Sequence, residues 1–286
     1  MKKHIQKPRM VLRLICLTLT FIATLTLIAL SGFANAQNEN LTQQSGINDA
    51  IATNATNIIL VHGAWADGSS WSKVIPILEK AGHKVIAVQM PEHSFSDDVA
   101  TVKRAIELVQ GPTVLVGHSY GGMVISNAAY NNTNIKGLVF IAAVAPNEGQ
   151  SISDFVDVKK LPKDLLITDS AGFVYFNPSK FHDTFAQDVN LTQANIMAAV
   201  QKPINQSIFA EKSGPPAWKQ LPVWYQVSEN DHAFPPAVEH QFAKQMNATT
   251  ISLASSHASL VSHPNEVAQL ILDAANYPSK GEKAAQ

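Results

Sequence analysis

Apolar residues along the chain fall into short continuous runs that alternate with segments of helical periodicity. Such runs are typical of strands buried on both faces, because a half-exposed strand would alternate apolar and polar residues. The predicted strands cover residues 57–63, 83–91, 112–117, 136–146, 222–228 and 248–255. The predicted helices cover residues 69–82, 96–110, 119–132, 236–246 and 265–276. This order predicts an α/β fold with a mostly parallel central sheet covered by helices on both faces.

The alternation breaks between residues 147 and 221, where the pattern is irregular and only short helices are predicted, among them segments within 173–185 and 210–218. A segment of about 75 residues is too long for an ordinary loop, and loops of such length are often functional. It has no strong apolar pattern that could form a core of its own. We therefore predict a helical cap inserted between two halves of the sheet.

The first 36 residues have the pattern of a signal peptide. A basic segment precedes an apolar run of 17 residues, and Ala34-Asn35-Ala36 forms a small-x-small cleavage site before Gln37. An uncleaved membrane anchor is the alternative, because the apolar run is close to the length that spans a bilayer. The cleavage site and the polar residues after it favour cleavage, which predicts a periplasmic or secreted protein without a membrane span.

The rest of the chain is divided accordingly into a flexible N-terminal segment over residues 37–56 and a folded domain over residues 57–286. The only cysteine, Cys16, lies in the predicted signal peptide, so the mature protein would contain no thiol, which suits an oxidising compartment. The formal net charge is −1 and charged residues make up 15%, so nothing in the composition indicates a nucleic-acid partner.

Residues 117–121 read Gly-His-Ser-Tyr-Gly and match the pattern G-x-S-x-G. The motif falls where a predicted strand ends and a helix begins, which is the position of a nucleophile elbow. A strained turn there would lift the Ser119 hydroxyl clear of the sheet, and the helix N-terminus would favour negative charge. The alternative is a helix-capping serine beside glycines that the backbone requires. The position of the motif favours a nucleophile.

A nucleophilic serine needs a base, and the base needs a carboxylate that orients it. In folds with a nucleophile elbow, the acid and then the histidine follow later strands. His257 comes just after the last predicted strand and is the predicted base, with His263 as its competitor. Asp231, after the preceding strand, is the predicted acid, followed in preference by Glu229 and Glu148.

Acyl transfer also requires N–H donors for the oxyanion of the transition state. One predicted donor is the backbone N–H of Tyr120, directly after the nucleophile. Gly63 permits a turn after the first strand, so the backbone N–H of Ala64 is the second predicted donor. Trp65 and His118 flank these groups and are predicted to contact the substrate. The alternative for the first loop is an ordinary glycine turn.

Four segments of the chain resemble the α/β-hydrolase superfamily: LVHGAWADGSSW, VGHSYGGMVISNAA, SENDHAFPP and SSHASLVSHP. They are most similar to a branch of small esterases that includes EstC-type esterases, plant methylesterases and hydroxynitrile lyases, over about residues 57–276. The resemblance implies an eight-stranded, mostly parallel sheet with a helical cap, and no metal or organic cofactor. Hydroxynitrile lyases of plants have a threonine and an acidic residue where this chain has Gly63 and His118, so hydrolysis is favoured.

These features predict a serine hydrolase that cleaves a small or medium carboxylic ester or a lactone through an acyl-enzyme. A small-ligand binding protein on the same fold is the alternative, because members of the superfamily also serve as receptors that retain the triad. The cap is rich in aromatic and apolar residues, which either contact an apolar group of the substrate or anchor the cap to the core. They are Phe173, Val174, Tyr175, Phe176, Phe181, Phe185 and Trp218.

Overall fold

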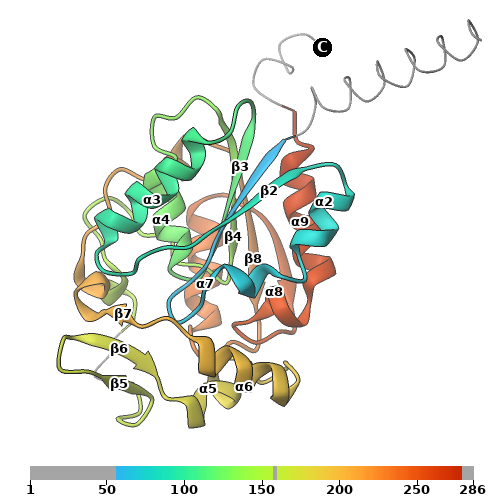
Figure 1. Cartoon of the computed structure of the whole chain (residues 1–286). Helices are drawn as coiled ribbons and strands as arrows, with labels where there is room; N and C mark the ends of the chain where they lie inside the picture. Colours follow the sequence, from blue (N-terminus) through green and yellow to red (C-terminus); the bar gives the residue numbers. More distant parts are fainter. Residues whose placement is uncertain (1–55, 157–159, 279–286) are drawn as a thin grey trace, which may run out of the picture. The chain divides into compact units, whose positions relative to one another are not determined.

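The computed structural model describes residues 56–156 and 160–278, so the predicted signal peptide and nearly all of the predicted flexible segment lie outside the described residues (Figure 1). Six strands form the central sheet in the order β2-β1-β3-β4-β8-β9, and every neighbouring pair is parallel. The strands are β1 (Asn57–Val61), β2 (Lys84–Val88), β3 (Thr113–His118), β4 (Ile135–Ile141), β8 (Val223–Ser228) and β9 (Thr249–Leu253).

Helices cover both faces of this sheet (Figure 1). One face packs against α3 (Phe95–Glu107), α4 (Gly121–Ala128) and α7 (Pro236–Gln245), and the other against α2 (Ile75–Lys80) and α9 (Pro264–Ala275). Successive residues of β1 point to opposite faces, so Ile59 belongs to the first core and Ile58 to the second. Burial on both faces is the reason that the strands are continuous apolar runs. The predicted fold class is confirmed.

The central sheet has six strands in the described part of the chain, whereas the family resemblance implies eight. The predicted helix over 69–82 is also divided, into the 3₁₀ helix η1 (Gly68–Trp71) and α2. Pro76 explains the division, because proline lacks an N–H and fits the first turn of a helix better than its interior.

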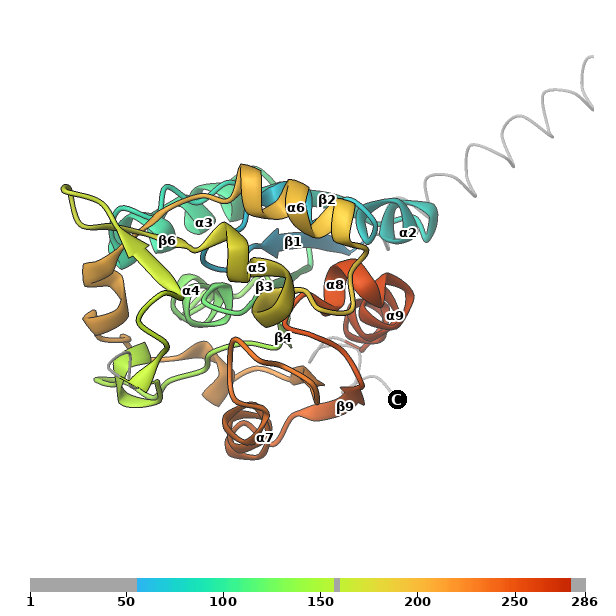
Figure 2. The ribbon, with the colours of Figure 1, turned by 90° about the horizontal axis from the view of Figure 1, so that it is seen from below.

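The cap contains strands as well as helices, so the expectation of a helical cap is corrected. Three strands, β5 (Leu166–Thr168), β6 (Phe173–Phe176) and β7 (Ile204–Asn205), form an antiparallel sheet beside α5 (Pro178–Phe185) and α6 (Leu191–Val200). Along β6, Val174 and Phe176 are buried while the residues between them are half-buried, which is the alternation of a strand. Figure 2 shows β6, α5 and α6 lying across the sheet.

The cap is completed by the short 3₁₀ helices η2 (Ile152–Asp154), η4 (Gln206–Ala210) and η5 (Ala217–Lys219), and α8 (Ser259–Ser262) precedes α9 in the main domain. None of the helices in residues 56–156 and 160–278 is long and apolar enough to cross a membrane.

Candidate active site

Ser119 lies in the turn between β3 and α4, and its φ is +52°. Its N–H donates to the carbonyl of Ile141 at 3.0 Å, and its own carbonyl accepts the N–H groups of Gly122 and Val144, each at 3.0 Å. Residues other than glycine rarely adopt a positive φ, and they keep it only where surrounding contacts hold it. These three hydrogen bonds do so here, and the turn leaves the Ser119 side chain in a cavity.

The glycines beside the serine let α4 begin directly against β1. A Cβ on Gly121 would lie 2.6 Å from the carbonyl oxygen of His62 and 2.7 Å from that of Val61. A Cβ on Gly117 would lie 2.6 Å from the backbone of Gly121. All three distances are shorter than the contacts that Cβ atoms make in proteins. The sharp turn therefore requires glycine at both positions of the motif.

His257 and Asp231 lie together in the segments that follow β9 and β8. The Nδ1 atom of His257 is hydrogen-bonded to Oδ2 of Asp231, and both side chains are buried. The other oxygen of Asp231 accepts the backbone N–H groups of Ala233 and Phe234, each at 2.7 Å. Since Nδ1 is bound to the carboxylate, Nε2 is the atom of His257 that is left for proton transfer.

The competing residues from the sequence lie elsewhere. Glu229 is exposed, and its Oε1 is 3.0 Å from Nε2 of His240. His263 faces Asp188, with 3.7 Å between its Nδ1 and Oδ2 of the carboxylate. Glu148 is exposed as well. None of the three competitors is among the residues that line the cavity at Ser119.

Ser119, His257, Ala64, Trp65 and Tyr120 line one cavity beneath the cap. The remaining lining residues are apolar except for one serine, and they come from the cap and from the ends of the central strands. They are Val144, Ile152, Ser153, Val156, Leu161, Leu165, Leu166, Phe176, Phe209, Ala233 and Phe234. Within the described residues, no charged side chain faces the cavity except the imidazole, when protonated. The cavity therefore suits an apolar molecule with a single reactive group.

His62 sets the direction of the Ala64 N–H. Its Nε2 accepts the backbone N–H of Met90 at 3.1 Å, so the proton is assigned to Nδ1, which donates to the carbonyl of Gly63 at 2.9 Å. That carbonyl and the N–H of Ala64 belong to one planar trans peptide, in which they point in opposite directions. Burial lowers the pKa of His62 to about 4, so the ring is neutral at physiological pH.

The other predicted donor, Tyr120, is held from behind by its own side chain. Its hydroxyl donates to Oδ2 of Asp98 at 2.6 Å, and Oδ1 of Asp98 accepts the backbone N–H of Glu92 at 2.8 Å. Burial raises the pKa of Asp98. In the sequence, Asp98 is an acidic residue near the start of a predicted helix, a common position that does not indicate a contact with Tyr120.

The two predicted substrate contacts differ in their positions. Trp65 lines the cavity, and its Nε1 donates to the carbonyl of Val174 in the cap at 3.0 Å. His118 does not line the cavity. It is buried behind the base, where its Nε2 is hydrogen-bonded to the carbonyl of His257 at 2.9 Å. The structure thus gives His118 a supporting position under the base, away from the place where a substrate would bind.

The aromatic residues of the cap divide in the same way. Phe176 lines the cavity and packs edge-on against Trp65, with 5.5 Å between ring centroids. Phe185 packs edge-on against His257 at 4.8 Å. Trp218 is buried in the core and does not reach the cavity. Some of these residues therefore contact the site and others anchor the cap.

The segment that follows α5 contacts the loops that carry the predicted acid and the predicted base. The side-chain amide of Gln187 donates to the carbonyl of Asn230, next to Asp231. Oδ2 of Asp188 accepts the backbone N–H of Ser256 at 2.9 Å, next to His257. The cap therefore holds the acid loop and the base loop as well as covering the cavity.

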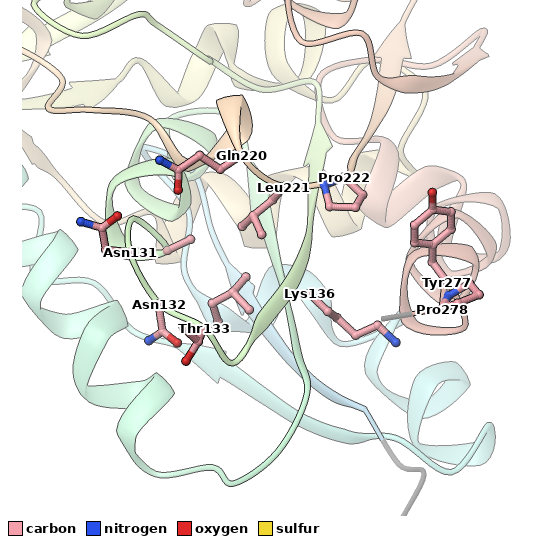
Figure 3. A pocket seen from close by; sticks show the side chains of 11 residues that line it. Asn131, Asn132, Thr133, Lys136, Gln220, Leu221, Pro222, Tyr277 and Pro278 are labelled. Carbon is pink, nitrogen blue, oxygen red and sulfur yellow. The ribbon is translucent and has the colours of Figure 1, made fainter. Parts of the chain in front are cut away.

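A larger hollow lies at the opposite edge of the sheet (Figure 3). Its lining includes Thr133 before β4, Pro222 before β8 and Tyr277 after α9. Because all six strands are parallel, the starts of β4 and β8 lie at the edge away from the strand ends that carry Ser119 and Asp231. None of the predicted site residues lines this hollow.

The family model described as alpha/beta hydrolase family matches residues 58–270, and the chain belongs to that family. A pyrethroid hydrolase from Sphingobium wenxiniae is 25% identical over 265 residues, which cover 80% of this chain and 91% of that protein. Polyneuridine aldehyde esterase from Rauvolfia serpentina is 25% identical over 259 residues, which cover 78% and 97% of the two chains.

Among solved structures, the chain is similar to a pyrethroid hydrolase from Sphingobium faniae, with a TM-score of 0.68 and 25% sequence identity. The superposition covers 78% of this chain and 98% of that chain. The family and these relatives support a carboxylic ester hydrolase.

Proposed function

We propose that the protein is a serine hydrolase that cleaves an apolar carboxylic ester or lactone through an acyl-enzyme on Ser119. The observation that carries this proposal is the arrangement of three side chains. Ser119 and His257 line the same apolar cavity, and the far side of the His257 ring is bound to the buried carboxylate of Asp231. A nucleophile, a base and an orienting acid are the parts that acyl transfer needs.

In the first half of the reaction, Nε2 of His257 takes the proton of the Ser119 hydroxyl as Oγ attacks the carbonyl carbon. Asp231 stabilises the imidazolium that forms. The N–H groups of Ala64 and Tyr120 bind the oxyanion of the tetrahedral intermediate. The intermediate then collapses as the imidazolium gives its proton to the leaving alcohol oxygen, and the acyl group remains on Ser119.

In the second half, water replaces the serine hydroxyl. His257 takes a proton from the water as its oxygen attacks the acyl carbon, and the proton then passes to Oγ of Ser119 as the carboxylic acid leaves. A lactone follows the same steps, except that the alcohol and the acid remain in one product.

The lining of the cavity supports an apolar substrate. A charged group would lose its hydration there without gaining a partner, whereas an alkyl or aromatic group gains by leaving water. A pyrethroid hydrolase and polyneuridine aldehyde esterase are among the relatives, which supports a small-molecule ester as the substrate. A panel of p-nitrophenyl esters and lactones of increasing chain length tests this preference.

We predict that Ser119→Ala abolishes turnover and leaves the fold intact. The change removes one oxygen that has no structural hydrogen bond assigned to it, while loss of a serine nucleophile costs about 10⁶-fold in kcat in a well-studied hydrolase. Release of p-nitrophenol, labelling by a fluorophosphonate and the melting temperature are the measurements. Ser126→Ala is the matched control, because it removes a buried hydroxyl from α4 outside the cavity.

Persistent labelling of the Ser119→Ala variant would show that the nucleophile is another residue. A wild-type protein that is stabilised by esters without releasing product would be a binding protein on the same fold.

A further inference from the structure

Glu239 is a buried carboxyl group behind the acid loop that the mechanism above does not use. It lies in the first turn of α7, and its side chain is inaccessible to solvent. Its Oε2 accepts the backbone N–H of Ser228, the last residue of β8, at 2.9 Å. Among the described residues, Oε1 has no hydrogen-bond partner. The carbonyl of the same Ser228 accepts the backbone N–H of Asp231 at 3.2 Å, so the carboxyl groups of Glu239 and Asp231 are neighbours in the interior.

Two carboxyl groups in contact inside a protein cannot both be ionised at low cost, since like charges repel and neither is hydrated. A single proton between them removes the conflict. The charge of Asp231 is stabilised by the ring of His257 and by the N–H groups of Ala233 and Phe234. Glu239 has only the N–H of Ser228. The proton therefore belongs on Glu239.

The other titratable groups near the pair do not change this assignment. Tyr225 on β8 donates its hydroxyl to the carbonyl of Ala143 at 2.6 Å, and burial raises its pKa. Glu229 is exposed and paired with His240 of α7. Burial, and then the charge of Asp231, raise the pKa of Glu239 to about 10.

We propose that Glu239 is a positioning residue that keeps a proton on its carboxyl and donates it to the carboxylate of Asp231, which holds Asp231 against the ring of His257. This inference rests on the proposed function, because Asp231 would serve as the acid of that mechanism. Glu239 touches neither the substrate nor a reacting atom. It acts on the reaction through the orientation and charge of Asp231.

Two substitutions of Glu239 should differ in the hydrogen bonds that they keep. In Glu239→Gln, the amide oxygen accepts the N–H of Ser228 and the amide nitrogen donates to Asp231 at every pH. In Glu239→Leu, the N–H of Ser228 loses its acceptor and Asp231 loses a donor. We therefore expect Gln to preserve kcat near neutral pH and Leu to lower kcat at least tenfold with a smaller change in KM.

The pH profile separates the wild type from the Gln variant. As Glu239 loses its proton at alkaline pH, a second negative charge appears beside Asp231 and displaces it, so wild-type kcat should fall at least tenfold between about pH 8 and about pH 11. The Gln variant has no proton to lose there and should show no such fall. Rates are measured with a p-nitrophenyl ester after subtraction of the Ser119→Ala rate, and circular dichroism at each pH monitors the fold.

Glu229→Gln is the matched control, because it removes an exposed carboxylate two residues from Asp231. It should retain the alkaline fall of the wild type. An alkaline fall in Glu239→Gln equal to that of the wild type would overturn the proposal, and so would a Gln variant as impaired at neutral pH as the Leu variant.

Infrared spectroscopy gives a readout that does not depend on turnover. Burial also raises the pKa of Glu92, so the carbonyl band of a protonated carboxylic acid is read from the difference between two spectra at neutral pH. The spectrum of the wild type minus that of Glu239→Gln should contain this band, and so should the spectrum of Ser119→Ala minus that of the double variant. Absence of the band from the first difference, with an active wild type, would overturn the role of Glu239 and leave the proposed function standing. Presence of the band together with turnover by Ser119→Ala would refute the nucleophile and retain the proton on Glu239.

Discussion

At the scale of single residues, the carboxylate of Asp231 is held by more contacts than any other charged group of the site. It accepts hydrogen bonds from the His257 ring and from the N–H groups of Ala233 and Phe234. Hydrogen bonds to an ionised acceptor are stronger than those between neutral groups, and together these three fix the direction of both oxygens. In the proposed mechanism, a carboxylate held in this way orients the imidazole before any substrate binds.

Asp231→Asn should therefore preserve the fold and lower kcat by about 10⁴-fold, the loss measured when the acid of a well-studied triad is replaced by its amide. The amide favours the wrong tautomer of His257 and does not stabilise the imidazolium. Glu229→Gln should lower kcat less than about twofold, because an exposed carboxylate contributes only a screened interaction. Both variants are compared on one ester at about pH 8, above the usual titration of histidine. If Glu229→Gln is inactive while Asp231→Asn retains the wild-type kcat, the acid of the mechanism is Glu229.

The sequence predicted Ser119, His257 and Asp231 as site residues because each follows a strand in a fixed order. Such an order can be recognised from the amino-acid sequence alone. The sequence could not predict Glu239. In a helix that reads PAVEHQFAKQ, a glutamate looks like a solvated residue, and its burial depends on a loop that the pattern does not place. The sequence also could not predict that His118 lies behind His257 and outside the cavity. Adjacency to Ser119 along the chain does not determine which way the last side chain of a strand points.

At the scale of elements, the site depends on the close approach of α4 to β1. The approach is set by Gly121, where backbone carbonyls of Val61 and His62 occupy the space of a side chain. Backbone atoms of a central strand cannot shift without moving the neighbouring strands. Since Tyr120 lies between Gly121 and Ser119, any retreat of the helix displaces the predicted oxyanion donor as well.

Gly121→Ala should lower the free energy of unfolding by about 1 to 3 kcal/mol, the usual cost of overpacking, and should lower kcat as well. Urea denaturation and ester hydrolysis measure the two effects. Gly214→Ala is the control, because its Cβ would meet a side-chain oxygen of Asn127 and no backbone atom of a strand. If the Gly121 variant is as stable and active as the wild type, the helix tolerates a side chain at the turn.

The inner strands β1, β3, β4 and β8 were predictable because each contains an apolar run and is almost entirely buried. The outer strands β2 and β9 are partly exposed and less apolar, and they were predictable from the alternation of strands and helices. The cap strands were not, because β5, β6 and β7 have three, four and two residues. So few residues show no period, and these strands exist through pairing with one another more than through their own composition.

At the scale of the whole molecule, buried ionisable groups set how stability changes with pH. Burial lowers the pKa of His62 to about 4, so this ring contributes stability above about pH 6.5 that is lost as the pH falls through 4. The pKa of Glu239 is raised to about 10, so the contribution of this group to stability decreases as the pH rises. Below the ordinary pKa of a glutamate its contribution is fully present, and it is lost as the pH rises through 10, because only the folded state keeps the proton.

Above about pH 6.5 the contribution of His62 is constant, but burial also raises the pKa of Glu92. The effect of Glu239 is therefore isolated by comparing Glu239→Gln with the wild type, since both proteins contain Glu92. The free energy of unfolding of Glu239→Gln, minus that of the wild type, should increase by about 1.4 kcal/mol per pH unit between about pH 7 and about pH 9. Urea denaturation at three pH values in this window measures it, with Glu229→Gln as the control for an exposed carboxylate. A difference that does not change with pH would mean that Glu239 is already ionised in the folded protein.

The contacts of Gln187 with Asn230 and of Asp188 with Ser256 bear on the redesign of specificity. Exchanging the whole cap for that of another hydrolase would introduce a new cavity wall. It would also remove the two hydrogen bonds that hold the loops of Asp231 and His257. A chimaera with a foreign cap could then bind its new ester and still hydrolyse it slowly. Grafts that replace the wall around Leu161, Leu165 and Phe176 and keep residues 183–188 of the host would separate recognition from reactivity.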